Sequence, residues 1–343
     1  MSGGSNFILS HSKFLDQINE IAFFVDQGGD PYFNMAIEEY LIHSGEKYIF
    51  RLWQNDKTVV IGRNQNPWRE CNISACVTDG ISIVRRLSGG GAVYHDIGNL
   101  NFSFFGPRDS SSYEELVLFV QSILSNFEIH AEARGRNDLV VDGCKVSGIA
   151  YFERLDRVCI HGTLLVESDL NRLATYLTPS PHKLINKGIE SVRARVGNLT
   201  DINPEITVNG IIEAVKEIIG KSPVRSGIEK NTMKIDQLLQ ELVLKYRSDD
   251  WNMGKTFDFD ISLEFQSTFG SMEFCFLVRK GIISKCRIDS DCLDVKLIED
   301  LSKLLCGMRL TKDGLRTAMD KVERNRENRE ILGLLNDWAG FCL

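Results

Sequence analysis

The chain has 343 residues, 43% of them hydrophobic and 25% charged, so it is long enough to form two domains with sizeable cores. Its formal net charge of −7 argues against a general nucleic-acid-binding protein, which needs a basic face. No apolar run approaches the roughly 18 residues of a membrane span, and no N-terminal segment has the pattern of a secretory signal. We therefore expect a cytoplasmic protein that binds neither nucleic acid nor membrane.

The N-terminal part of the chain alternates short strands with amphipathic helices. A strand is expected at 21–25, and Asp30 followed by Pro31 predicts the start of a helix. Two further strands are expected at 48–53 and 58–61. Trp53 ends the first of them, where it either belongs to the core, the commoner case, or lines an apolar ligand pocket.

The stretch from Arg85 to Ser103 contains three consecutive glycines at 89–91. Glycines allow a backbone to approach a ligand and to adopt positive φ, so that successive N–H groups can converge on an anion. A strand at 80–84 leads into this loop, and alternating residues at 100–104 predict a half-buried strand after it. Arg85 and Arg86 are neighbours on the incoming strand, so only one can face the loop, and we expect it to be Arg86.

The middle of the chain contains a hairpin signal. Ser112 and Glu115 predict a helix start. Asp142-Gly143 between two apolar runs then predicts a tight hairpin, which places Lys145 on a rigid strand. A strand at 158–166 is expected to be broken at His161, which either contacts a ligand or is a buried, hydrogen-bonded histidine.

The C-terminal half begins with a short helix after Asp169 and a strand at 191–199. Arg193 and Arg195 share a face of that strand and either steer an acidic protein partner or are solvated. Helices are expected at 209–219 and 232–246. The change of pattern near 248–254 predicts two domains, 1–248 and 249–343, the second with strands at 257–265, 272–280 and 282–288 and helices from 294 and 312.

Nine cysteines form no Cys-x-x-Cys pair and are odd in number, so neither a disulfide framework nor a zinc site is indicated. We expect reduced thiols and no tightly bound cofactor.

The segment from Arg85 to Asp96 resembles the arginine and triple-glycine signature of the lipoate-protein ligases, in particular the two-domain bacterial type. Further stretches are similar to that family in the family's order: 31–39, 60–68, 135–139, 145–148 and 191–196. The resemblance extends over residues 25–343 and leaves out the first twenty or so. It implies an α+β fold, with a large domain of the class II synthetase and biotin-ligase type built on a mixed β-sheet and a small α+β C-terminal accessory domain.

The resemblance also implies an ATP-dependent ligase. It would activate lipoate to lipoyl-AMP, release pyrophosphate, and transfer the lipoyl group to a lysine of an acceptor. The implied acceptors are lipoyl domains of 2-oxoacid dehydrogenase complexes (E2) and the glycine cleavage H protein, and the implied ligase is a monomer. Because both reactants are anionic, such a site needs positive charge and N–H donors where they meet, with Mg²⁺ on the leaving pyrophosphate.

The resemblance assigns Lys145 the catalytic role, between the lipoyl carboxyl group and the α-phosphate of ATP. Arg86 and the backbone of Gly91, Ala92, Val93 and Tyr94 are expected to bind ATP, Asn137 to contact the intermediate, and Asp138 to hold Mg²⁺. Two alternatives stay open. One is a lipoyl or octanoyl transferase without adenylation activity of its own, including a version that uses Cys144 as an acyl-carrying thiol. The other is a non-catalytic lipoate- or nucleotide-binding protein.

Overall fold

A mixed eight-stranded sheet forms the centre of the larger part of the molecule in the computed structural model of the chain, which describes residues 21–110, 112–178, 196–220, 224–226, 237–254, 258–322 and 328–339. The strand order is β11-β1-β2-β6-β10-β9-β8-β7. Strand β1 pairs in parallel with β2 and β11, and the pairs from β2 to β7 are antiparallel. The strands are β1 (Ile21–Gly29), β2 (Tyr48–Asn55), β6 (Asn99–Pro107), β7 (Glu132–Arg134), β8 (Asp138–Val141), β9 (Cys144–Arg154), β10 (Arg157–Leu165) and β11 (Val224–Ser226).

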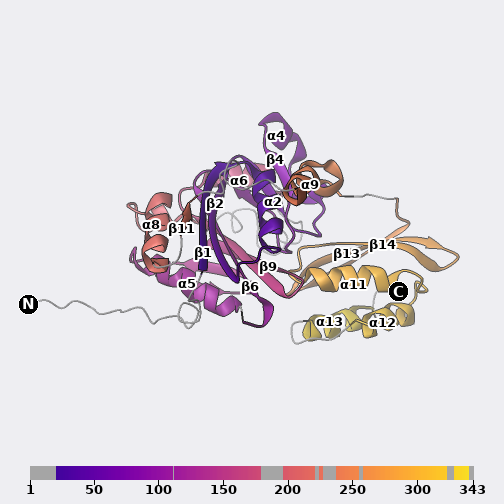
Figure 1. The fold of residues 1–343 in the computed structure, drawn as a ribbon. Helices are drawn as coiled ribbons and strands as arrows, with labels where there is room; N and C mark the ends of the chain where they lie inside the picture. Colours follow the sequence, from indigo (N-terminus) through magenta and orange to yellow (C-terminus); the bar gives the residue numbers. More distant parts are fainter. Residues whose placement is uncertain are drawn as a thin grey trace, which may run out of the picture.

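Helices cover both faces of this sheet (Figure 1). Helices α5 (Tyr113–Ser125) and α8 (Val208–Ile219) pack on one face, and α2 (Pro31–Leu41) and α9 (Gln237–Arg247) pack on the other. The predicted helix starts are confirmed: the Asp30 side chain accepts the Tyr32 and Phe33 N–H groups, and the Ser112 hydroxyl accepts the Glu115 N–H. The predicted α+β class with a mixed sheet is therefore confirmed.

A second, three-stranded sheet holds both ends of the glycine loop. Its order is β4-β3-β5, with β4 (Ser82–Arg85) parallel to β3 (Thr58–Ile61) and β5 (Val93–His95) antiparallel to it. Short helices α3 (Pro67–Glu70) and α4 (Ile73–Thr78) lie between β3 and β4 in the sequence, and α6 (Leu170–Tyr176) packs against the same sheet. The sequence did not predict β5, because it has only three residues and lies between the glycines and a turn.

Two predictions about strands were wrong. Strand β6 is buried along both faces instead of half-buried, because it lies between β2 and β10 and its polar side chains are hydrogen-bonded inside the protein. Strand β10 is not broken at His161, since His161 pairs with Ser103 of β6 and with Ala150 of β9.

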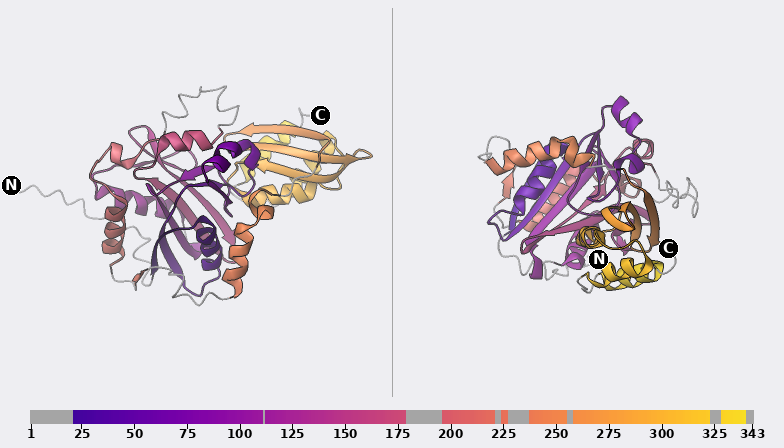
Figure 2. Two further views of the ribbon diagram at one scale, coloured as in Figure 1. Left: turned by 90° about the horizontal axis from the view of Figure 1, so that it is seen from above. Right: turned by 90° about the vertical axis from the view of Figure 1, so that its right-hand side faces the viewer.

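The C-terminal residues form a separate α+β unit beside the large sheet (Figure 2). Strands β12 (Ile261–Ser267), β13 (Gly270–Arg279) and β14 (Ile282–Ser290) form an antiparallel sheet. Helices α11 (Val295–Leu305), α12 (Lys312–Asp320) and α13 (Arg329–Ala339) share one core with it. The α+β composition predicted for this unit is confirmed.

The segment between the two parts is fastened to the larger one. Helix α10 (Asp249–Asn252) follows α9, and the Arg85 guanidinium donates to Trp251 O and Asn252 O, both at 2.9 Å. The Trp251 indole donates back to Arg85 O at 2.8 Å. The chain then passes Gly254, which has a φ of +77°. The domain division at residue 248 remains a prediction, and these contacts place residues 251 and 252 against the larger part.

Several expectations concern residues that the structure does not describe, namely 1–20, the strand at 191–195 with Arg193 and Arg195, and residues 232–236 of the predicted helix. No disulfide joins the cysteines of the described ranges. None of the helices in those ranges combines the length and apolarity needed to cross a membrane.

Glu39 is a buried carboxylate that ties α2 to α9 and β9. It accepts the Tyr246 hydroxyl at 2.8 Å and forms ion pairs with Lys245 and Arg154. Burial raises the pKa of Glu39, but the hydrogen bond and charge of Lys245 outweigh burial, so this pKa lies below its ordinary value of 4.5.

We predict that Glu39→Gln lowers the free energy of unfolding by about 2 kcal/mol at pH 7, because it leaves a partly buried lysine without its carboxylate. A carboxylate with a lowered pKa stabilises the fold above pH 4.5, and this contribution is lost as the pH falls through the pKa of the folded state. Urea unfolding over a pH series should therefore show a difference from wild type that shrinks below about pH 4.5. Glu213→Gln, on the exposed face of α8, is the control and should change stability by less than about 0.5 kcal/mol. A difference that does not depend on pH would contradict the assignment.

Candidate active site

A cavity of about 320 Å³ lies where the large sheet, the glycine loop and the C-terminal unit meet. Its floor is a row of paired residues across five neighbouring strands. Trp53 of β2 pairs with Asn101 of β6, and Asn101 pairs with Thr163 of β10. The Thr163 hydroxyl accepts the Gly148 N–H of β9 at 3.2 Å, and Gly148 pairs with Asp138 of β8.

All five residues of this row line the cavity. Neighbouring strands are about 4.8 Å apart, so the four steps from Trp53 to Asp138 span about 19 Å. The cavity is therefore an elongated trough across the sheet, with an aromatic residue at one end and a carboxylate at the other.

Lys145 reaches the carboxylate end of the trough along its own strand. The Asp142-Gly143 turn has a φ of 50° and 81° at its two residues, which confirms the predicted hairpin and the place of Lys145 on its second strand. The Lys145 ammonium lies 2.6 Å from Asp138 Oδ1. A Cβ on Gly148 would lie 3.1 Å from Lys145 Nζ, so glycine at 148 leaves room for this path.

Arg86 is buried beneath the glycine loop and fixes its shape. Its guanidinium donates to Gly89 O at 2.6 Å, Gly91 O at 2.7 Å and Val60 O at 3.2 Å. Burial lowers the pKa of Arg86 to about 10, which still leaves the side chain charged at neutral pH. Arg85 points the other way, toward the carbonyls of Gly62, Arg63 and Gln65 and toward those of the last two residues of α10.

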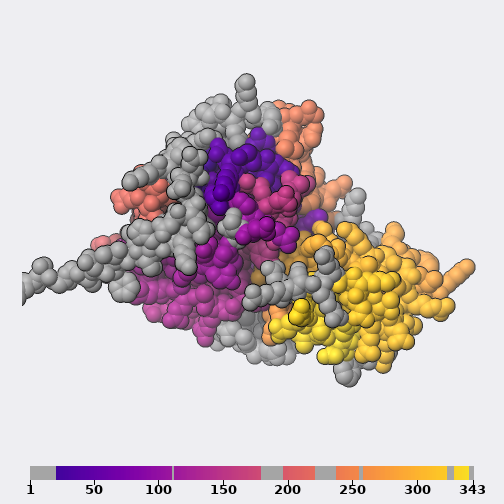
Figure 3. All heavy atoms as spheres, turned by 60° about the horizontal axis from the view of Figure 1, so that its bottom comes forward, coloured from indigo at the N-terminus to yellow at the C-terminus, as the bar shows by residue number. Residues whose placement is uncertain are grey.

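The C-terminal unit covers the loop and contributes to the cavity. Asp291 and Leu293 are among its lining residues, and the Gly90 N–H donates to Cys292 O at 3.3 Å. A Cβ on Gly89 would lie only 2.2 Å from Cys292 O. Figure 3 shows the C-terminal residues packed directly against the larger part. In this arrangement Cys292 O accepts the hydrogen bond that the Gly90 N–H would otherwise donate to an anion bound at the loop.

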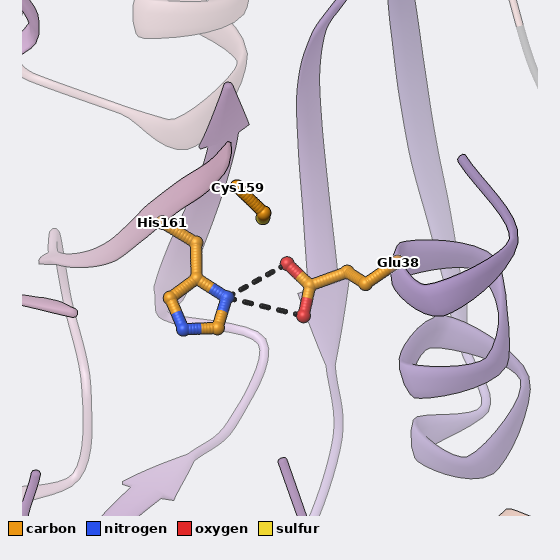
Figure 4. A group of neighbouring side chains, drawn as sticks. All are labelled: Glu38, Cys159 and His161. Atoms are coloured by element: carbon orange, nitrogen blue, oxygen red, sulfur yellow. Dashed lines mark hydrogen bonds and ion pairs between the residues drawn. The ribbon is translucent and has the colours of Figure 1, made fainter. Parts of the chain in front are cut away.

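Glu38, Cys159 and His161 lie close together (Figure 4), and Glu38 and His161 line the cavity. His161 Nδ1 lies 2.9 Å and 3.1 Å from the two Glu38 oxygens. Burial raises the pKa of Glu38, yet the charge and hydrogen bond of His161 outweigh burial, so this pKa is lowered and the carboxylate is ionised. Of the two readings of His161 from the sequence, the buried and hydrogen-bonded one holds, and the residue also lines the cavity.

Donor chemistry argues against a metal ion at this group. Burial raises the pKa of Cys159 well above its ordinary value of 9.0, whereas metals bind the thiolate. The fully buried Arg51 adds a positive charge that acts on both Glu38 and Cys159. We therefore interpret the group as a carboxylate hydrogen-bonded to an imidazole, beside a neutral thiol.

The structure brings most of the candidate residues to the one cavity: Arg86, Gly91, Ala92, Val93, Asn137, Asp138 and Lys145. The Tyr94 side chain is separate from them. It is buried in β5 and packs on Tyr176, because successive strand residues point to opposite sides and Val93 and His95 face the cavity. Cys144 is not among the lining residues.

Sequence reasoning did not assign Glu38, His95, Asn101, Arg136, Asp291 or Leu293 to the site, although all of them line it. Arg136 lies in a stretch, 135–139, that supplied two candidate residues. Glu38 and His95 also lie in stretches that resemble the family, 31–39 and 85–96. Asn101, Asp291 and Leu293 carry no such local signal, because strand pairing and the position of the C-terminal unit bring them to the cavity.

We predict that Gly89→Ala separates the loop from the C-terminal unit, since the added Cβ would overlap Cys292 O. Amide hydrogen exchange at Gly90 should become faster, on the order of tenfold, as its bond to Cys292 O is lost. Gly91→Ala is the matched control, because no atom lies within 4 Å of a Cβ at that position. Equal exchange in the two variants would show that Gly89 is not the point of contact.

Comparison with known proteins identifies the family. The family described as "Lipoyl protein ligase A/B catalytic domain" matches residues 30–220, and "Bacterial lipoate protein ligase C-terminus" matches residues 256–335. "Lipoate-protein ligase A" of Bdellovibrio bacteriovorus is 40% identical over 333 residues, which cover 94% of this chain and 98% of that protein.

Two solved structures are similar over much of the chain. LipL1 of P. falciparum in complex with lipoate has a TM-score of 0.80 and 31% identity, covering 93% of this chain and 98% of that one. A crystal structure of lipoate-protein ligase A bound with ATP has a TM-score of 0.57 and 27% identity, covering 68% of this chain and 98% of that one. The chain therefore belongs to the lipoyl protein ligase family and is a ligase.

Proposed function

We propose that this ligase activates lipoate with ATP and transfers the lipoyl group to a lysine of an acceptor protein. The observation that carries the proposal is the trough, which leads from Trp53 to the Lys145–Asp138 pair and passes the glycine loop. Support for the two substrates comes from the structural neighbours, one in complex with lipoate and one bound with ATP.

The lipoyl chain would lie along the floor of the trough. Its dithiolane ring would pack near Trp53 and its carboxylate would reach Lys145, because an end-to-end span of about 19 Å leaves room for both the acyl chain and a phosphate. The Lys145 ammonium is paired with Asp138. We expect a carboxylate and a phosphate to take the place of Asp138 as partners of this cation.

In the first half-reaction a carboxylate oxygen of lipoate attacks the α-phosphorus of ATP. An oxygen–phosphorus bond forms, the bond to the bridging oxygen breaks, and pyrophosphate leaves with the electron pair. Two anions meet in this step, so a fixed positive charge lowers its barrier without reorganisation. Lys145 supplies that charge, Arg86 keeps the glycine loop in shape, and the loop's N–H groups would hold the nucleotide with Gly91, Ala92 and Val93 at the cavity wall.

Asp138 and Asn137 would hold Mg²⁺ at the same end of the trough. Mg²⁺ in such sites is bound by one or two carboxylates together with substrate phosphates, which fits one carboxylate and one amide oxygen on the cavity wall. When bound, the ion neutralises charge on the leaving pyrophosphate. Asn137 would also hydrogen-bond the acyl-adenylate.

In the second half-reaction the neutral amine of the acceptor lysine attacks the acyl carbonyl, AMP leaves, and the amine loses a proton. We propose lipoyl domains of 2-oxoacid dehydrogenase E2 subunits and the glycine cleavage H protein as acceptors, on the family resemblance. A version through a Cys144 thioester has less support, because Cys144 does not line the cavity. We further propose that the enzyme acts as a cytoplasmic monomer.

Lipoate-dependent exchange of radiolabelled pyrophosphate into ATP, with Mg²⁺ and without acceptor, tests the adenylation step. We expect exchange. Transfer from supplied lipoyl-AMP without exchange would instead identify a transferase. Loss of both activities, with lipoate still bound, would identify a binding protein.

We predict that Lys145→Ala lowers the exchange rate by about 10²- to 10³-fold, since it removes the fixed charge between the reacting anions. Lys216→Ala on the surface of α8 is the control and should exchange like wild type. An undiminished rate in Lys145→Ala would exclude the catalytic role.

The metal role of Asp138 predicts that Asp138→Asn raises the Mg²⁺ concentration required for half-maximal exchange. An increase of about tenfold is expected for the loss of one carboxylate ligand from the cation. An unchanged Mg²⁺ dependence would remove Asp138 from the metal site.

A further inference from the structure

A continuous chain of buried polar side chains runs beneath the trough from its aromatic end to the glycine loop. Its members come from β2, β6, α2, β10 and the loop after β4: Trp53, Ser103, Glu38, His161, Ser88 and Arg86. Their exposed fractions range from 0% to 7%. Neither the predicted binding sites nor the proposed chemistry uses Ser88, Ser103 or His161.

The contacts follow one another without a gap. The Trp53 indole donates to Ser103 Oγ at 2.7 Å, and the Ser103 hydroxyl donates to Glu38 Oε1 at 2.5 Å. The same Glu38 oxygen lies 2.9 Å from His161 Nδ1, within hydrogen-bond distance. Together they form the half of the chain that lies under the acyl end of the trough.

The second half reaches the loop. His161 Nε2 lies 2.7 Å from Ser88 Oγ, and the Arg86 Nε–H donates to the same oxygen at 2.9 Å. Arg86 then binds the carbonyls of Gly89 and Gly91. Because Glu38 takes the Nδ1 side of the imidazole, the Nε2 side is turned toward Ser88.

Burial makes the chain sensitive to a change at either end. The side chains are almost completely buried, so solvent poorly replaces a hydrogen bond that lengthens. A ligand that packs on Trp53 restrains the side chains at that end, and a nucleotide on the loop restrains Arg86 and Ser88 at the other. The first ligand to bind therefore bears the entropic cost of ordering the chain, and the second ligand binds more tightly because the chain is already ordered.

Resting on the proposed function, we propose that Ser88 and His161 are positioning residues that couple the acyl end of the trough to the nucleotide loop. Lipoate then strengthens ATP binding, and ATP strengthens lipoate binding by the same factor. Ser88 does not line the cavity, so it acts through Arg86 and the loop and not by touching either substrate. His161 lines the cavity and connects Glu38 to Ser88 through its two ring nitrogens.

The test is calorimetric titration of the full chain with an ATP analogue whose α,β-bridge cannot be cleaved, with Mg²⁺, in the absence and presence of saturating lipoate. In wild type we expect lipoate to lower the dissociation constant of the analogue by about tenfold, within the usual range of coupling between sites. In Ser88→Ala the factor should fall toward one, while the dissociation constant for lipoate alone changes less than about twofold. Ser88→Thr keeps the hydroxyl and should restore the coupling.

Ser147→Ala is the matched control, because Ser147 is as buried as Ser88 and close to the site but does not line the cavity. It should couple like wild type. If Ser88→Ala does not fold, Glu38→Gln interrupts the same chain and should also lose the coupling.

A coupling factor in Ser88→Ala equal to that of the wild-type protein would overturn the inference. So would a wild-type protein that binds both ligands without any coupling between them. Failure of wild type to bind either ligand would overturn the proposed function and this inference with it. A merely structural role of Ser88 would change stability but leave the coupling factor intact, which also contradicts the proposal.

Discussion

One buried guanidinium holds the glycine loop together. Arg86 binds two carbonyls of the loop and one of β3, and these bonds turn the opposite sides of the same peptides outward, since N–H and C=O of a trans peptide point in opposite directions. The Gly90 N–H accordingly faces Cys292 of the C-terminal unit. Without Arg86 the loop would lose its shape, its contact with that unit and its link to Ser88 together.

The register of the large sheet places everything else relative to this loop. Trp53 and Asp138 face the same trough because five strands pair in step, and a slip of one residue in any of them would turn its side chain to the other face. Tyr94 illustrates the same rule in the small sheet, where its neighbours Val93 and His95 face the cavity and it does not. A chemically selective site thus depends on pairings between residues far apart in sequence.

Local signals were sufficient for much of the fold. The Asp30 and Ser112 caps and the Asp142-Gly143 turn act within a few residues, so the helix starts and the Lys145 hairpin could be predicted. The burial of β6 could not be predicted, because the hydrogen-bond partners of its polar side chains come from β2 and α2, which are distant in sequence. Asn101 and Asp291 were missed as site residues for the same reason: strand pairing and the position of the C-terminal unit bring them to the cavity, and no short motif records either.

The proposed reaction depends on an acyl-adenylate that this chain makes in the trough without a partner. The most direct measurement is to incubate the enzyme with lipoate and Mg·ATP without acceptor, separate the protein from free ligands, and determine the mass of the small molecule that stays with it. We predict lipoyl-AMP, close to one per chain. Recovery of unreacted lipoate and ATP, from a protein that binds both, would contradict the account.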